Sequence, residues 1–84
     1  MPKVESVPLR QNGAALRAIR QREGLTIAGL ANKVSKSLAI SEPHLRNIEN
    51  ELKSASIEHL AVIAKVLEVP LAAIRRNPGA EDAA

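Results

Sequence analysis

The sequence predicts an all-α fold, a compact five-helix bundle. Its apolar residues are mainly Ala, Leu, Ile and Val, without Phe, Trp or Tyr, and this composition favours short helices over sheets. These residues recur at helical spacing in five segments, and each segment starts at a capping residue or at a proline. A chain of 84 residues has room for one hydrophobic core, so we expect a single folded domain.

The first two helices are predicted to begin at Asn12 and Thr26, because both side chains can accept a hydrogen bond from the first helical turn. Gly24 suits the end of the first helix, where a left-handed residue is common. The apolar positions are Ala15, Leu16 and Ile19 in the first helix, and Ile27, Leu30, Ala31 and Val34 in the second.

The other three helices are predicted to start at Ser41, at Ser54 or Ser56, and at Pro70. Pro43 fits the first turn of the third helix, where a missing N–H does no harm. The fourth helix is apolar nearly all round, as expected of a helix that is buried or lies in a dimer seam. The apolar positions of the three are Leu45, Ile48 and Leu52; Ile57, Leu60, Ala61, Val62, Ile63, Ala64, Val66 and Leu67; and Leu71, Ala72 and Ile74.

The helical domain is predicted to span residues 12–76, between a flexible, basic N-terminal arm (1–11) and a flexible tail (77–84). The absence of cysteine excludes disulfides and thiol chemistry, and the absence of aromatic side chains argues against base-stacking single-strand binders. No apolar run is long enough to cross a bilayer, and the start MPKVESVPLR has no apolar signal-peptide core. We therefore expect a cytoplasmic protein.

Charge is distributed unevenly along the chain. The residues up to Ile48 include eight basic and three acidic side chains, a net charge of +5, whereas the remainder carries −2. Such a basic half indicates that one face of the protein meets a polyanion, although an uneven solvated surface would give the same pattern.

Five short patterns follow one another along the chain. They are Leu16-Arg17-x-Ile19-Arg20; Gly24-Leu25-Thr26; Leu30-Ala31; Ile40-Ser41 with Leu45 and Ile48-Glu49; and Ile63-Ala64-x-x-Leu67-x-Val69. Together they extend over residues 13–76 and resemble the lambda-repressor-like, Cro/repressor-type (XRE-like) helix-turn-helix family. The resemblance implies a bacterial or phage transcriptional regulator of the repressor or Cro kind. Such a protein would bind double-stranded DNA sequence-specifically at the nucleoid, without a cofactor.

The helix that begins at Ser41 is the one that, by this resemblance, reads the major groove. Its predicted inner stripe is aliphatic, and its outer face is short, polar and narrow enough for a groove about 12 Å wide. The stripe comprises Leu45, Ile48 and Leu52, and the outer face comprises Pro43, Asn47 and Asn50.

Side-chain chemistry suggests which residues of this helix contact bases. Asn47 can pair bidentately with adenine, and Arg46 can donate to guanine or grip a phosphate. Glu42 either accepts a hydrogen bond from cytosine or points aside as a partner of the helix N-terminus. We expect His44 to bond a base or phosphate rather than to enter the core. The predicted base contacts are Glu42, Pro43, His44, Arg46 and Asn47.

Phosphate contacts are expected from basic and hydrogen-bonding side chains around that face. The candidates are Arg10, Thr26, Lys33, Lys36, Ser41, Asn50 and Lys53. The resemblance further implies that Arg20 and Glu49 form a partly buried bidentate ion pair, which fixes the recognition helix against the first helix. Two independently solvated charges are the alternative.

The sequence departs from the family pattern at the start of the second helix and in the turn after the third helix, two places that would lie near DNA. Ile27 stands where a polar residue usually contacts phosphate, so either Thr26 supplies that contact or it is lost. Glu51 and Leu52 stand where a Gly and a basic residue are common. That turn therefore lacks the glycine that adopts a left-handed conformation without strain. An exposed Glu51 would also face the DNA backbone unfavourably.

The connection between the second and third helices is also longer than the family pattern. Five residues separate Val34 from Ile40, where one is common. Leu38 continues the apolar stripe of the second helix. Either that helix is one turn longer, or residues 35–37 form a widened loop.

One helix-turn-helix buries little surface on DNA, so we expect a homodimer on a two-fold site. The candidate dimer residues are Val62, Val66, Leu71, Ala72 and Ile74. The alternative function is a protein-interaction module of the same fold, such as an antitoxin or an anti-repressor.

We do not expect an enzyme. His44 and His59 lie on different predicted helices, without a nucleophile motif, a phosphate loop or a cluster of metal ligands. His59 is interpreted as a surface residue of the fourth helix, with no geometric relation to His44.

Overall fold

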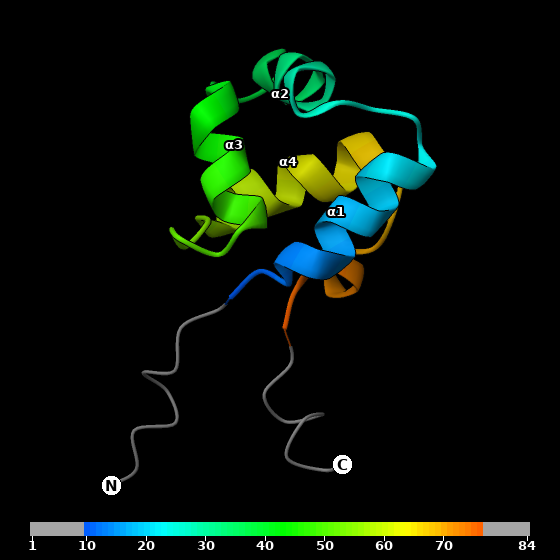
Figure 1. Cartoon of the computed structure of the whole chain (residues 1–84), viewed down its shortest axis with the longest axis vertical. Helices are drawn as coiled ribbons and strands as arrows, with labels where there is room; N and C mark the ends of the chain where they lie inside the picture. Colours follow the sequence, from blue (N-terminus) through cyan, green and yellow to red (C-terminus); the bar gives the residue numbers. More distant parts are fainter. Residues whose placement is uncertain (1–9, 77–84) are drawn as a thin grey trace, which may run out of the picture.

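Four α-helices and one 3-10 turn follow one another in residues 10–76, the part of the chain that this computed structural model describes. The α-helices are α1 (Gly13–Arg22), α2 (Ile27–Ser35), α3 (Glu42–Glu49) and α4 (Ile57–Leu67), and the turn is η2 (Leu71–Ile74) (Figure 1). The all-α prediction is therefore confirmed, but the described residues hold four α-helices instead of five. Most of the predicted arm (1–9) and the predicted tail (77–84) lie outside the described residues.

Each α-helix starts at a short polar side chain that caps it. Asn12, Thr26, Ser41 and Ser56 precede the four helices, and each side-chain oxygen accepts a hydrogen bond from the backbone N–H three residues later at 2.9–3.1 Å. These bonds satisfy N–H groups that have no partner within the helix. The predicted starts are thus confirmed, and the fourth helix begins after Ser56 and not after Ser54.

Three α-helices end in the same left-handed turn. Gly24, Glu51 and Glu68 have φ angles of 73°, 59° and 60°, and the N–H of the following residue bonds to the carbonyl five residues before it. Because Glu51 adopts this conformation, α3 stops at Glu49 and the chain turns away from the core. The prediction that Leu52 continues the inner stripe is therefore wrong, and its side chain is 70% exposed.

The fifth predicted helix is a single 3-10 turn because the chain leaves it to pair with the N-terminal segment. Pro70 is extended at the start of η2, and Arg75 is extended directly after it. The Asn12 N–H donates to the Ile74 carbonyl and the Arg76 N–H to the Arg10 carbonyl, both at 2.8 Å. These bonds hold the two ends of the domain side by side (Figure 1).

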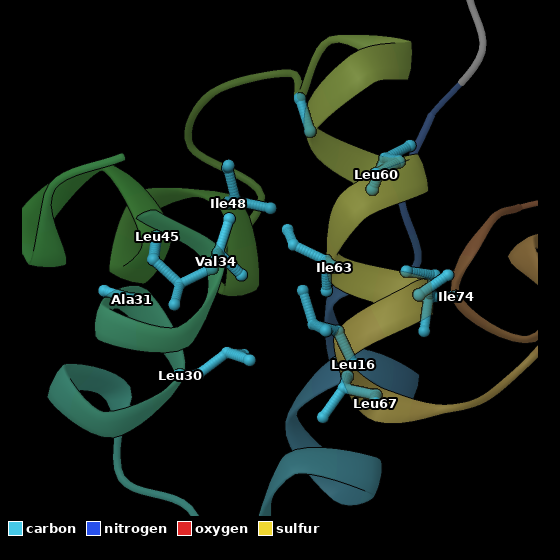
Figure 2. Packing of buried hydrophobic residues seen from close by; sticks show 12 residues of the cluster. Leu16, Leu30, Ala31, Val34, Leu45, Ile48, Leu60, Ile63, Leu67 and Ile74 are labelled. Atoms are coloured by element: carbon cyan, nitrogen blue, oxygen red, sulfur yellow. The ribbon is translucent and has the colours of Figure 1, made fainter. Parts of the chain in front are cut away.

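The core consists of aliphatic side chains from all five elements and from the loop before α4. Figure 2 shows the side chains of α2 and α3 facing those of α1, α4 and η2. The buried residues are Leu16, Leu30, Ala31, Val34, Leu45, Ile48, Ala55, Leu60, Ile63, Ala64, Leu67 and Ile74. Because Ile74 is fully buried within one chain, its prediction as a dimer contact is wrong.

Gln11 belongs to the folded domain, although the sequence predicts it as the end of the arm. Its side chain is completely buried, and its Nε2 donates to the carbonyls of Ile48 (3.0 Å) and Lys53 (2.7 Å). Its Oε1 accepts from the Ala55 N–H at 3.2 Å. One amide thus bonds to three backbone groups in the last turn of α3 and in the loop before α4, and it ties the N-terminal segment to both.

Candidate nucleic-acid interface

The third helix divides sharply into a buried and an exposed side. Leu45, Ile48 and Glu49 are buried, whereas Pro43 and Asn50 are exposed. Because the inner side chains are anchored in the core, the outer face is held outward as a polar surface. We call the outer side of residues 41–50, without the buried Leu45, Ile48 and Glu49, the α3 ridge.

Five of the residues predicted to contact DNA surround one open hollow of about 330 Å³ on this ridge. Pro43, His44 and Asn47 come from the predicted base contacts, and Ser41 and Lys53 come from the predicted phosphate contacts. The structure therefore brings an apolar ring, three hydrogen-bonding side chains and a cation together on one surface. Arg10, Thr26, Lys33 and Lys36 do not line this hollow.

Glu42 and Arg46 form an ion pair across one turn of α3. Arg46 Nη2 donates to Glu42 Oε2 at 2.9 Å, and both side chains remain about half exposed. Exposed pairs of this spacing contribute only about 0.3–0.5 kcal/mol. A nucleic-acid ligand can therefore compete for Arg46 at little cost.

The connection between α2 and α3 is a widened loop and not an additional helical turn. The Val34 carbonyl accepts from the N–H groups of Ser37 and Leu38, both at 2.9 Å, which ends α2. The Ser35 hydroxyl donates to the Ile40 carbonyl at 2.9 Å and accepts from the Ile40 N–H at 3.3 Å. These bonds close the loop immediately before the cap of α3.

His59 also fixes this loop, a role that the sequence interpretation missed. Its Nε2 donates to the Ala39 carbonyl at 3.1 Å, because a carbonyl oxygen can only accept. Its Nδ1 lies 2.8 Å from the Ser56 hydroxyl oxygen. The rings of His59 and His44 have centroids 5.3 Å apart, so the statement that the two histidines are unrelated in space is wrong. Sequence spacing gave no signal for a contact between a loop and a helix twenty residues later.

Arg20 and Glu49 are paired in the interior between α1 and α3. Arg20 Nε and Nη2 donate to the two oxygens of Glu49 at 2.5 and 3.1 Å, and Arg20 Nη1 donates to the Leu25 carbonyl at 2.8 Å. The Arg20 side chain is 10% exposed and that of Glu49 is 2% exposed. The pair therefore fixes the C-terminal end of α3 against α1 and lies away from the outer face.

Glu51 faces the start of α1 instead of a ligand. Its Oε2 accepts from the Gly13 N–H at 2.8 Å and from Arg76 Nη2 at 2.7 Å, and Arg10 lies 3.9 Å from Oε1. The hydrogen bond from Arg76 and then that from Gly13 hold the pKa of the Glu51 carboxyl below its ordinary value. Glu51 is thus paired with cations of the domain itself, and its side chain is 23% exposed.

Replacing Glu51 with glutamine is expected to lower stability at neutral pH by about 1 kcal/mol, because the charge-assisted bonds are lost. A lowered folded-state pKa stabilises the protein above the unfolded-state pKa, and this contribution disappears as pH falls through the folded-state value. The difference between wild type and Glu51→Gln should therefore shrink between pH 7 and pH 3 in urea unfolding. Glu23→Gln, which removes an exposed carboxylate 3.8 Å from Arg22, is the matched control and should change little. A difference that stays constant over this pH range contradicts the assignment.

The remaining predicted dimer residues are distributed between partly buried and exposed positions. Val62, Val66 and Leu71 are partly buried, and Ala72 is exposed. In the described part of the chain, the large hydrophobic side chains that are exposed are Leu52 and Ile57, which are not among the predicted dimer residues.

Residues 10–76 contain no helix that is long and apolar enough to cross a membrane. Within the same range, no group of three or more His, Cys, Asp or Glu side chains could hold a metal ion.

A capped helix with an anchored underside and a polar ridge, braced by two neighbouring helices, defines a helix-turn-helix domain. The family model that matches the chain is HTH_3, a helix-turn-helix family of the XRE and lambda-repressor-like type, over residues 16–74. The chain belongs to this family, which consists of DNA-binding transcription regulators and is generally non-enzymatic. No curated protein and no solved structure matches the chain.

Proposed function

We propose that this protein is a repressor or Cro-like regulator that reads a specific double-stranded DNA site with the α3 ridge in the major groove. The observation that carries the proposal is the hollow on this ridge, where Asn47 and His44 lie beside Ser41 and Lys53. Amide side chains read base edges, whereas hydroxyl and ammonium groups bind the phosphates beside them. One surface therefore offers both kinds of contact.

Two features of the fold support a rigid reading helix. The buried Arg20–Glu49 pair fixes the C-terminal end of α3, and the bonds from Ser35 and His59 fix the loop before its N-terminal end. A helix held at both ends keeps its side chains in register with base pairs, which selective recognition requires.

The proposed complex contains two copies of the chain on a two-fold DNA site. A single module of this size buries too little surface on DNA for high selectivity. Two copies bound to half-sites about 34–36 Å apart would double the number of base contacts. The spacing of half-sites recovered from a random duplex pool tests this arrangement directly.

The proposal is tested by selecting a duplex from that pool and titrating it, beside a scrambled duplex, over a range of salt concentrations. Specific binding predicts an affinity that falls steeply with salt and is higher for the selected duplex. Two results together would support the protein-interaction alternative. One is the absence of binding to any duplex at low salt, and the other is a stoichiometric complex with a purified protein of the kind that an antitoxin or an anti-repressor binds.

Asn47→Ala is expected to relax base preference at one position of the selected site by roughly 1–3 kcal/mol. Its free energy of unfolding should change by less than about 0.5 kcal/mol, because the amide is not part of the core. Competition binding with duplexes substituted at each base pair measures the preference. Gln21→Ala removes an exposed amide from α1 and is the matched control. If Asn47→Ala keeps full selectivity at every position, the ridge is not the reading surface.

A further inference from the structure

The geometry points to a phosphodiester clamp formed by Arg17 of α1 and Asn50 at the end of α3. The sequence predicts Asn50 alone as a phosphate contact, and Arg17 is not among the predicted contacts. The inference rests on the proposed DNA binding and names a residue and an arrangement that deepen it.

The first observation is the orientation of the Asn50 amide. Arg17 Nη2 donates to Asn50 Oδ1 at 2.5 Å. A guanidinium has only donors, so this contact requires the amide oxygen to face α1. The Nδ2 group, with its two N–H donors, is therefore the part of the amide that Arg17 does not use, and Asn50 is an exposed residue. The pair presents donors outward, which is the chemistry that a phosphate oxygen needs.

The second observation is the charge balance of Arg17, Arg20 and Glu49. Glu49 already receives two hydrogen bonds from Arg20, whereas Arg17 Nε approaches it at 3.4 Å. Two guanidinium groups therefore share one carboxylate, and the cluster carries a surplus positive charge. Arg17 is the exposed member, since its side chain is 47% exposed while the other two are buried. The surplus charge is thus presented to solvent beside Asn50.

The third observation is the position of this charge at the C-terminal end of α3. Free carbonyls at a helix C-terminus carry partial negative charge and repel a phosphate. Asn50 is the residue directly after α3, so its amide alone would lie in an unfavourable potential. The Arg17 guanidinium offsets that potential and supplies further N–H groups in a planar fork that matches phosphate oxygens.

The fourth observation is that the clamp and the base-reading surface share one face. Asn50 lies three residues after Asn47, close to one helical turn, so the two amides follow one another along the ridge. The first half of α1 packs against the C-terminal end of α3 (Figure 1), and the hydrogen bond from Arg17 to Asn50 places Arg17 next to that end. With Asn47 at the base edges, the clamp reaches the sugar-phosphate strand that borders the groove.

The test compares Arg17→Gln with a matched control, Arg22→Gln. The control removes the same charge from α1, at a side chain that is 65% exposed and lies beside Glu23. Affinity for the selected and scrambled duplexes is measured by fluorescence anisotropy over a series of salt concentrations. Arg17→Gln should weaken binding to both duplexes by a similar factor, roughly tenfold, and reduce the slope of log affinity against log salt by about 0.9. Arg22→Gln should leave the slope unchanged.

Two further variants separate charge from geometry. Arg17→Lys keeps the charge but loses the fork, so the salt slope should remain while affinity falls several-fold. Asn50→Asp places a carboxylate at the clamp and should weaken binding more than Asn50→Ala does. Unfolding curves for all variants show whether a loss of binding reflects a loss of fold, and Arg17→Lys provides the comparison if Arg17→Gln is unstable.

The clamp is overturned if Arg17→Gln and Arg22→Gln give the same affinity and the same salt slope while wild type still binds the selected duplex. That result leaves the proposed DNA binding intact, because base preference is measured independently through Asn47→Ala. Failure of the wild-type protein to bind any duplex, by contrast, overturns the proposed function and the clamp together.

Discussion

Replacing Gly13 with alanine is expected to destabilise the fold by about 3 kcal/mol or more, although alanine is the better helix former. A Cβ atom at this position would lie 2.0 Å from the Glu49 carbonyl oxygen and 2.9 Å from its carbonyl carbon. Both atoms belong to the backbone of α3, which cannot rotate away as a side chain can. The start of α1 and the end of α3 would have to separate, which would disturb the adjacent Arg20–Glu49 pair and Gln11.

Gly29→Ala is the matched control for this prediction. Gly29 is also helical, but its Cβ would meet the Thr26 Oγ1 at 3.2 Å and a methyl of Leu25 at 3.7 Å. The gain in helix propensity is about 1 kcal/mol and is comparable to the cost of a small side-chain shift. Urea unfolding followed by circular dichroism should therefore show a change below about 1 kcal/mol for Gly29→Ala. Equal losses for the two variants would show that backbone contact at Gly13 is not the cause.

The second large effect is expected at the Arg20–Glu49 pair. Arg20→Met or Glu49→Leu alone should cost about 3 kcal/mol or more, because each leaves a charge buried without its main partner. The combined variant Arg20→Met/Glu49→Leu should be more stable than either single variant, since no uncompensated charge remains and the new side chains can pack. Arg17 lies 3.4 Å from Glu49 and is the residue that can partly compensate in Arg20→Met.

A double-mutant cycle measured by urea unfolding tests this prediction. The coupling energy between Arg20 and Glu49 should exceed about 1 kcal/mol, whereas Arg22 and Glu23, an exposed pair at the C-terminal end of α1, should show almost none. Additive losses at Arg20 and Glu49 would indicate two independently solvated charges, the alternative raised by the sequence.

The sequence was sufficient where structure depends on local chemistry. Asn12, Thr26 and Ser41 cap their helices because a short polar side chain reaches the N–H three residues later, and that geometry needs no distant partner. Gly24 ends α1 for a similar reason, since its left-handed φ strains other residues. The helical period of the aliphatic residues likewise predicted most of the side chains that enter the core, with Leu52 and Ile57 as exposed exceptions.

The sequence was insufficient where the partner lies far along the chain. Gln11 bonds to groups 37–44 residues away, so nothing near it in the sequence indicated burial. Leu52 has the right spacing for the inner stripe, but Glu51 adopts a left-handed conformation stabilised by Gly13 and Arg76. Spacing along one helix cannot reveal such a turn.

The same distinction applies to the candidate interface. Helical spacing placed Pro43 and Asn47 on the outer face of α3, where the structure also shows them. Arg17 was not predicted as a contact because its significance depends on Asn50, thirty-three residues later on another helix. His59 was missed for the same reason, since its partner Ala39 lies in a loop of unusual length.

The single buried amide of Gln11 also determines where the minimal folding unit begins. A chain shortened to start at Asn12 would keep every helical residue and the first helix cap. It would nevertheless lose the hydrogen bonds to the carbonyls of Ile48 and Lys53 and to the N–H of Ala55, which lie in the last turn of α3 and in the loop that follows it. Truncation and fusion boundaries for this domain therefore belong ahead of Arg10, two residues earlier than helix limits alone would suggest.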